Sequence, residues 1–223
     1  MKLLIAGAGV AGSYLYRLLI RKGFPPSDIV LSDISPTTQC RQHPCAWGVG
    51  PQIFHLLKEV GLDPWNYILA PGPAVSLDGE LVKASLWTIN KPFLLRDLTD
   101  NRLILFPQDV SPAKFDRIID ATGEARAFSS LLAQDIKANL TQAHYACRHY
   151  VQPAFKYHSN IGYSWAIPLL GSVHVGSGGL KGHELATPQQ FGIDCGKEIC
   201  RCAAQVRLTG PVFPLVRGKV WTV

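Results

Sequence analysis

Residues 7–12 read Gly7-Ala8-Gly9-Val10-Ala11-Gly12, and this glycine pattern decides the fold. Apolar residues before it, over 2–6, predict a buried strand, and apolar residues at helical spacing follow it over 10–22. In such a turn the first glycine permits the bend, the second lets the backbone approach a pyrophosphate, and the third lets helix pack on strand. We therefore expect a dinucleotide at the N-terminus of the helix.

A second apolar run over 29–32 ends at Asp33 and completes a β-α-β unit, whose strands should be parallel because a helix crosses between them. Asp33 follows Gly12 by 21 residues, where its carboxylate can accept hydrogen bonds from both ribose hydroxyls. Its charge would repel a 2′-phosphate, so the site suits FAD or NAD better than NADP. A plain glycine turn is the alternative interpretation.

The rest of the chain predicts a nucleotide-binding α/β sheet that β-rich insertions interrupt. Aspartate and glycine at 78–79 predict a type I′ turn, because both tolerate a positive φ. The patterns predict helices at 51–60, 128–140 and 187–206, a hairpin of 74–77 with 80–87, a β-rich stretch over 161–178, and strands at 103–106, 117–120 and 219–223.

Composition excludes several classes of protein. Hydrophobic residues make up 47% of the 223 residues and charged residues 17%, which is typical of a globular chain rather than a disordered one. The net charge of +6 is diffuse, so we expect no nucleic-acid partner, although an anionic small molecule or an acidic membrane surface would suit it. No apolar run reaches the roughly 20 residues of a spanning helix. Six cysteines without a convincing secretory signal indicate reduced thiols and a cytoplasmic protein.

Residues 116–123, Asp-Arg-Ile-Ile-Asp-Ala-Thr-Gly, resemble the D-x-x-x-x-A-T-G element of flavoprotein oxidoreductases. The small residues Ala121, Thr122 and Gly123 would let the end of the strand approach a cofactor. Related aromatic-ring monooxygenases usually have Asp-Gly here. That pair is absent, which favours a reductase over a hydroxylase, and a strand ending in an ordinary turn is the alternative.

A tyrosine–tryptophan signature is the most specific feature. Tyr163-Ser164-Trp165-Ala166-Ile167-Pro168, followed after seven residues by Gly176-Ser177-Gly178, resembles the Y-x-W-x-F-P, G-x-G signature of the geranylgeranyl reductase family. Ile167 replaces the usual phenylalanine. The resemblance implies that Tyr163, Trp165, Pro168, Gly176 and Gly178 bind substrate, because a polyisoprenoid needs an apolar, aromatic-lined slot. Core packing of the two aromatic side chains is the alternative.

Pro44-Cys45 resembles the Pro-Cys element that many family members place beside the flavin ring, although Ala46 stands here for the family's glycine. Hydride addition to an alkene also requires a proton, which the Cys45 thiol could supply as the catalytic acid; a buried structural cysteine is the alternative. Arg41 could bind a cofactor phosphate or pair with a surface carboxylate.

Cys195, Cys200 and Cys202, with Cys147 as a candidate fourth ligand, raise the question of a metal site. On a helix over 190–206, Cys195 and Cys202 would lie about 20° apart and Cys200 about 140° from Cys195, so they would not converge. We therefore expect core packing and no metal, with an iron–sulfur or redox role left open. His174 would share a face with Gly176 and could look into the pocket, but it is expected to face solvent.

Taken over the chain, the resemblance implies an α/β flavoprotein of the p-hydroxybenzoate hydroxylase type. A Rossmann-like FAD-binding domain would comprise residues 1–68, 91–124 and 205–223, and an inserted β-rich substrate domain 69–90 and 125–204. FAD, reduced by an external donor such as NAD(P)H or a ferredoxin-like protein, would saturate double bonds of a prenyl lipid. Peripheral membrane contact would fit such a substrate.

Two alternatives remain open. In the family, the strand matching 219–223 runs into a Gly-Asp/Glu-x-x-G helix at the flavin, and the sequence stops at Val223 before such a motif. A truncated, catalytically inactive remnant is therefore the competing interpretation, and we expect residues 1–223 to purify colourless or poorly soluble. An NAD-dependent reductase is the third interpretation.

Overall fold

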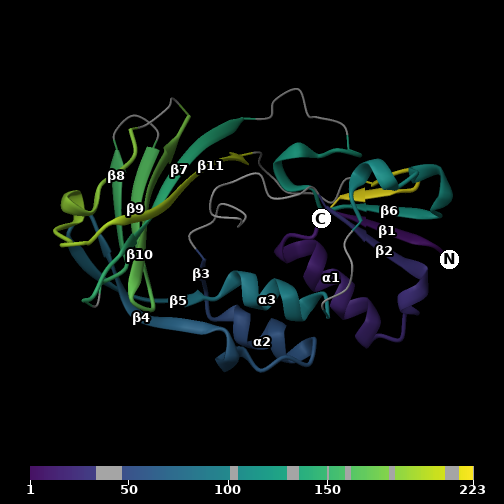
Figure 1. Ribbon diagram of the computed structural model, residues 1–223, viewed down its shortest axis with the longest axis horizontal. Coiled ribbons are helices and arrows are strands. Elements are labelled where there is room, and N and C mark those ends of the chain that lie inside the picture. The colour runs from purple at the N-terminus through teal and green to yellow at the C-terminus, as the bar shows by residue number, and fades with distance from the viewer. Residues whose placement is uncertain are drawn as a thin grey trace.

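The computed structural model shows two β-sheets of unequal size joined by helices (Figure 1). It describes residues 1–33, 47–100, 105–129, 136–149, 151–158, 162–180, 184–208 and 216–222. Arg41 and Cys45, two of the predicted site residues, lie outside the described residues.

The smaller sheet carries the glycine turn. Its strand order is β12-β13-β6-β1-β2, with β13, β6, β1 and β2 parallel and β12 antiparallel at the edge. The strands are β1 (Leu3–Ala6), β2 (Ile29–Ser32), β6 (Arg117–Asp120), β12 (Val216–Arg217) and β13 (Val220–Thr222). Helix α1 (Val10–Arg21) connects β1 to β2 and packs Tyr16 into a core with Ile5 and Leu31. The predicted β-α-β unit and closing strand are confirmed.

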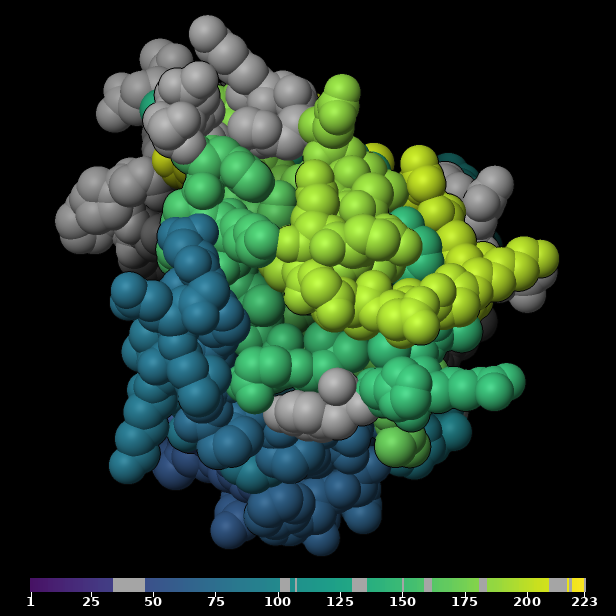
Figure 2. Space-filling model, turned by 90° about the vertical axis from the view of Figure 1, so that its left-hand side faces the viewer, coloured from purple at the N-terminus to yellow at the C-terminus, as the bar shows by residue number. Residues whose placement is uncertain are grey.

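The larger sheet forms a curved wall, on the left in Figure 1. Its order is β11-β7-β10-β9-β8-β4-β5-β3. The strands are β3 (Gly48–Val49), β4 (Ile68–Leu77), β5 (Glu80–Ile89), β7 (Lys137–Ala146), β8 (Ala154–His158), β9 (Gly162–Leu169), β10 (Ser172–Gly179) and β11 (Glu198–Arg207). On its outer face, Ala166, Val173 and Val175 pack with Ala186 and Phe191. Figure 2 shows the yellow-green C-terminal segment covering the green strands there. The other face is turned toward the smaller sheet.

Helices α2 (Gln52–Glu59) and α3 (Lys91–Leu98) connect the two sheets and share one core with α1 (Figure 1). Leu57, Leu94 and Leu98 are buried in this core, and Tyr14 of α1 packs against it. The helix expected at 51–60 is confirmed as α2. Among the described residues, no helix is both long and apolar enough to cross a membrane.

Short 3-10 turns make up the remaining helical structure. They are η1 (Pro26–Asp28), η2 (Pro64–Asn66), η3 (Pro107–Asp109), η4 (Pro112–Lys114), η5 (Gly123–Ala125) and η6 (Pro188–Phe191).

The predicted hairpin is confirmed as β4 and β5, which are longer than expected. Asp78 and Gly79 have φ values of 51° and 94°, as a type I′ turn requires. Of the strand expected at 103–106, the described part forms a bridge between Leu105 and Ser32. Helix α3 was not predicted, although Asn90 caps it by accepting a hydrogen bond from the Phe93 N–H, a signal readable from sequence.

Two predicted helices are wrong. Residues 130–135 of the helix expected over 128–140 lie outside the described part of the chain, and residues 137–140 belong to β7, which pairs with both β10 and β11. In place of a helix over 187–206 it has η6 and β11. The capping box of Thr187 and Gln190 is present, but Gly192 adopts a φ of 69° and ends the turn after four residues. Pairing between strands overrides local helix propensity in both segments.

Candidate functional site

The three glycines of the turn have separate structural roles. An added Cβ at Gly7 would lie 2.2 Å from the Ala121 carbonyl oxygen, and one at Gly12 would lie 1.9 Å from the Gly7 carbonyl oxygen. Both positions therefore require glycine for packing. A Cβ at Gly9 would meet no atom within 4 Å, so only the second glycine borders open space. This is the space that a pyrophosphate needs.

The N-terminus of α1 suits an anion. Gly9 is the N-cap residue and supplies no side-chain hydrogen bond, and the first turn holds no acidic residue. Val10 and Ala11 are exposed at this end, which leaves backbone N–H groups and the positive end of the helix dipole available to a ligand. The Ser13 hydroxyl donates instead to the Ala8 carbonyl oxygen, 2.9 Å away. The residues present therefore fit a bound dinucleotide.

Strand β6 ends directly beside the glycine turn. The Ala121 N–H donates to the Ala6 carbonyl oxygen over 2.8 Å, and the Ala121 carbonyl borders Gly7. Gly123 has a φ of 63° and open space around it, so another residue would be strained there. The structure thus brings together the glycine turn and the Ala-Thr-Gly element, as expected from the sequence.

A buried carboxylate holds the Ala-Thr-Gly segment in place. Asp120 is 1% exposed and accepts hydrogen bonds from the N–H groups of Phe128 and Ser129 at 2.9 and 2.8 Å. Thr122 donates to it through both its backbone N–H (3.2 Å) and its hydroxyl (2.5 Å). Burial raises the pKa of Asp120, but these hydrogen bonds outweigh it and hold the pKa below its usual value. The Thr122 hydroxyl is therefore committed to Asp120 and also accepts a hydrogen bond from the Ala127 N–H, so it is not available to a ligand.

Asp33 follows β2 next to the turn. The Gly7 N–H donates to the carbonyl oxygen of Ser32, the residue before Asp33, over 2.7 Å. The Asp33 N–H donates to the Leu105 carbonyl oxygen over 3.0 Å, which fixes the end of the strand. Asp33 is therefore placed at the same sheet edge as the glycines, where a ribose would lie.

Sequence reasoning missed Lys91, the first residue of α3. The residue as a whole is 8% exposed, and no hydrogen bond or ion pair joins its ammonium group to any other residue in the described part of the chain. Its stem is buried while the ammonium group reaches solvent, as is common for long basic side chains. The sequence shows only that a lysine follows Asn90, the N-cap residue of α3, and this position does not by itself indicate that the residue is buried. Lys91 is a candidate to bind an anionic group.

An apolar cavity of about 320 Å³ lies on the inner face of the larger sheet. Tyr163, Trp165 and Ile167 of β9 line it together with Trp47 and Cys202. The Tyr163 and Trp165 rings lie 5.3 Å apart, and the Trp165 indole N–H donates to the Gln142 side-chain oxygen over 3.2 Å. Trp165 is only 5% exposed. It thus both lines the cavity and packs in the sheet.

The other signature residues are placed differently. Pro168 does not line the cavity, because side chains alternate along β9 and Trp165 and Ile167 already occupy the cavity face. An added Cβ at Gly176 would lie 2.3 Å from the Trp165 ring, and one at Gly178 would lie 2.1 Å from Leu140. The glycines therefore make room for side chains of neighbouring strands rather than for a ligand touching the backbone.

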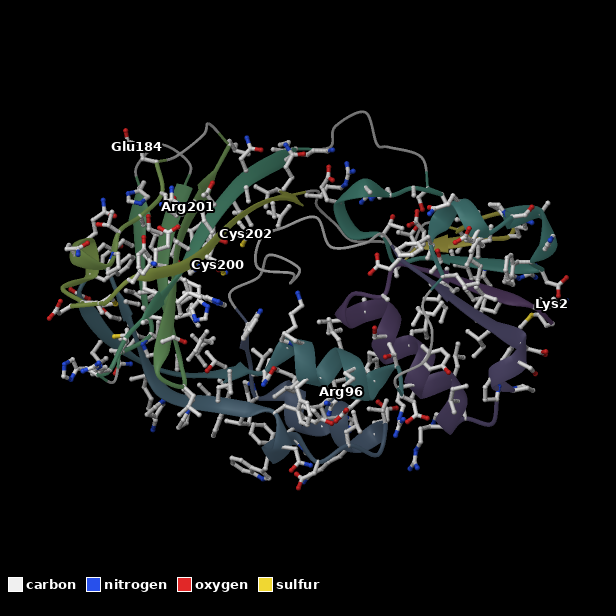
Figure 3. All side chains as sticks on the ribbon, in the orientation of Figure 1. Lys2, Arg96, Glu184, Cys200, Arg201 and Cys202 are labelled. Atoms are coloured by element: carbon white, nitrogen blue, oxygen red, sulfur yellow. The ribbon has the colours of Figure 1, made fainter. Side chains whose placement is uncertain are left out.

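The cysteines do not form a helix stripe. Cys200 and Cys202 lie two residues apart on β11 and are labelled in Figure 3, with Arg201 between them. Cys202 is a free thiol but Cys200 is disulfide-bonded, so the prediction of reduced thiols is wrong at Cys200. Cys195 packs with Cys147 on the outer face, and burial, followed by the hydrogen bond with Cys147, raises the pKa of the Cys195 thiol to about 12. Among the described residues, no three His, Cys, Asp or Glu side chains cluster as metal ligands would.

His174 does not face solvent as expected. It is 3% exposed, and its ring contacts Trp47 and His144 edge-on, with centroids 4.9 and 4.7 Å apart. Burial lowers the pKa of His144, whose Nε2 lies 2.7 Å from the Ser172 hydroxyl. The expectation was wrong because β7 and β9 flank β10 on both sides and Trp47 covers this ring.

Comparison with known proteins identifies the fold. No family model matches the sequence, and neither does any curated protein. The chain superimposes over 100% of its length on a geranylgeranyl bacteriochlorophyll reductase-like protein from Thermoplasma acidophilum, with a TM-score of 0.72 and 14% identity, and covers 70% of that protein. The flavin-dependent brominase Bmp2 superimposes with a TM-score of 0.67 and 12% sequence identity, and the chain covers 71% of it. The probable FAD-dependent monooxygenase pqsL of Pseudomonas aeruginosa superimposes with a TM-score of 0.61 and 13% sequence identity, and the chain covers 78% of it.

At these identities the likeness concerns the fold alone. The chain has the mixed α/β fold of FAD-dependent flavoprotein oxidoreductases, with a parallel nucleotide-binding sheet and a large curled sheet, as predicted. The similar proteins include a reductase-like protein, a halogenating enzyme and a monooxygenase, so the fold does not select among these chemistries.

Proposed function

We propose that this chain binds FAD and uses it in reduced form to saturate a double bond of a prenyl lipid. The observation that carries the proposal is the apolar cavity on the inner face of the larger sheet, lined by Tyr163 and Trp165 of the reductase-like signature. Such a cavity excludes water and offers an aromatic surface to a hydrocarbon chain. The glycine turn, with its open space at Gly9, supports the cofactor part of the proposal.

The cofactor would be held by backbone and charge. The N–H groups at the start of α1 would bind the pyrophosphate, and Asp33 would accept hydrogen bonds from a ribose. Ala121 and Gly123 would approach the cofactor through their backbones, and the buried Lys91 would supply a counter-charge. The role of Arg41 toward a phosphate stays a prediction.

Bound FAD supplies hydride chemistry, and the protein supplies position and environment. Trp165, fixed by its hydrogen bond to Gln142, would hold the chain of the substrate, and Tyr163 would cover it. Hydride goes to one alkene carbon and a proton must reach the other, so that the alkene is reduced as the cofactor is oxidised. We propose the Cys45 thiol as the proton donor, and an external donor such as NAD(P)H or a ferredoxin-like protein as the source of electrons.

The experiment is a single-turnover assay under anaerobic conditions. The protein is loaded with FAD, reduced with dithionite, and mixed with geranylgeraniol, and the product is analysed by mass spectrometry. The proposal predicts a gain of two hydrogens per reduced double bond and reoxidation of the flavin. Incorporation of oxygen in air, with no hydrogen gain without air, would point to a monooxygenase and contradict the proposal.

A further inference from the structure

A second cavity adjoins the first on the same face of the larger sheet. It measures about 300 Å³ and is lined among others by Ala138, Tyr157 and Leu208. Leu140, Tyr163 and Val206 line both cavities. The two cavities are therefore neighbours, and Tyr163 lies where they meet.

The strands explain why the two cavities are in line. Every second residue of a strand faces the same side, and the side chains that form the groove on β7, β9 and β11 follow this rule. They are Ala138, Leu140 and Gln142 of β7, Tyr163, Trp165 and Ile167 of β9, and Cys202, Ala204 and Val206 of β11, continued by Leu208.

The central strand deepens the groove. On β10, which lies between β7 and β9, Gly176 and Gly178 pair with Trp165 and Tyr163. Neither glycine adds a side chain to the face, so Leu140 and Trp165 can lie down over the strand. The backbone of β10, with these two side chains over it, therefore forms the base of both cavities.

The groove is as long as a lipid chain. From Cys202 to Leu208 the strand advances by about 20 Å at roughly 3.3 Å per residue. One leaflet of a bilayer has a hydrocarbon layer of about 15 Å, half of the roughly 30 Å core. Ligand sites typically have volumes of about 300–1,000 Å³. The volume of the first cavity lies at the lower end of this range, and the combined volume of the two cavities lies near its middle.

One polar group marks the far end. Tyr157 pairs with Tyr163, shares the groove face and is 64% exposed. His158 is the next residue of β8, and its hydrogen bond of 2.7 Å with the Ser164 hydroxyl places its ring on the outer face of the sheet. The groove therefore runs from an apolar interior to a rim where the Tyr157 hydroxyl can donate or accept a hydrogen bond.

We propose that the two cavities form one binding groove for an elongated amphiphile, whose apolar chain passes Tyr163 and whose polar head lies at Tyr157. The second cavity determines the length of chain that the protein prefers. The inference rests on the proposed function only for the prenyl nature of the chain.

The test measures binding by calorimetry, without turnover, for geraniol, farnesol and geranylgeraniol. In the unaltered protein the affinity should rise along this series, by up to about fourfold per additional buried methylene. Leu208→Trp would fill the second cavity. Leu208 is 50% exposed, so the variant should fold. Geranylgeraniol should lose about tenfold or more in affinity, and geraniol less than about twofold.

The matched control is Leu81→Trp, because Leu81 is 69% exposed and lines a different cavity. It should leave all three affinities unchanged. Tyr157→Ala is a second, milder probe of the second cavity and should again weaken the longest ligand most. The inference would be overturned if Leu208→Trp and Tyr157→Ala weakened the binding of all three alcohols equally, or if neither variant weakened it. It would also be overturned if farnesol and geranylgeraniol bound the unaltered protein no more tightly than geraniol does.

These outcomes separate the inference from the proposed function. If binding depends on chain length and Leu208 as described but no hydrogen is transferred, the groove stands and the reductase proposal fails. If geranylgeraniol is reduced and Leu208→Trp binds it as well as the unaltered protein does, the reductase proposal stands and the groove fails.

Discussion

Replacing Gly9 with alanine should separate cofactor binding from folding. Gly9 has φ and ψ of −68° and −171°, an extended conformation open to any residue, and the new Cβ would meet no atom within 4 Å. The fold therefore accommodates the methyl group. Alanine restricts the unfolded chain more than glycine does, which stabilises by about 0.4–1 kcal/mol. It is also a poorer N-cap residue, which costs a similar amount, so Gly9→Ala should change the free energy of unfolding by less than about 1 kcal/mol.

The same methyl group would fill the space that a pyrophosphate needs at the start of α1. A hydrogen bond to a charged group contributes roughly 1.5–3 kcal/mol. Losing one or two of them, about 3 kcal/mol in total, would weaken FAD binding by about a hundredfold. The variant should therefore be about as stable as the unaltered protein and bind FAD far more weakly.

Urea melts and calorimetric titration with FAD measure the two effects. Gly12→Ala is the control, because its Cβ would lie 1.9 Å from the Gly7 carbonyl oxygen and should destabilise the fold itself. Unchanged FAD affinity in Gly9→Ala, or a loss of stability as large as that of Gly12→Ala, would refute the reasoning. Failure of the unaltered protein to bind FAD would remove the site altogether.

Three further predictions concern residues around the two candidate sites. Lys91→Met should lower FAD affinity about tenfold or more and leave the apoprotein about as stable as the unaltered protein. FAD titrations should show that Lys91→Arg and the exposed-site control Lys83→Met bind normally. Asp120→Asn should cost on the order of 3 kcal/mol at pH 7 in urea melts. Because the pKa of Asp120 is lowered in the folded protein, its stabilisation is complete above about pH 4 and is lost as the pH falls further, so the deficit of the variant should shrink in acid; a deficit independent of pH would contradict this. Trp165→Phe removes the hydrogen bond to Gln142 and should lower the free energy of unfolding by about 1 kcal/mol. It should also weaken geranylgeraniol binding and leave FAD affinity unchanged. Equal losses of affinity for both ligands would show that Trp165 has a purely structural role.

Local signals in the sequence determined the half of the chain's fold that carries the glycine turn. The glycine turn, the strand before it, α1 and the turn at Asp78 depend on backbone conformations that neighbouring residues dictate, so they could be predicted without the rest of the fold. The alternation of Tyr163 and Trp165 likewise predicted that both face one side of a strand, and both line the cavity.

Only the tertiary structure decided what depends on pairing between distant segments. The segments of β7 and β11 read as helices because their apolar residues also fit a helical period, and pairing with each other and with β10 made them strands. The approach of Ala121 to Gly7, the burial of Lys91 and the alignment of two cavities along four strands arise where residues far apart in sequence meet. The sequence could therefore nominate residues for the cofactor and the substrate, but the shape of each site is set by contacts that no local pattern encodes.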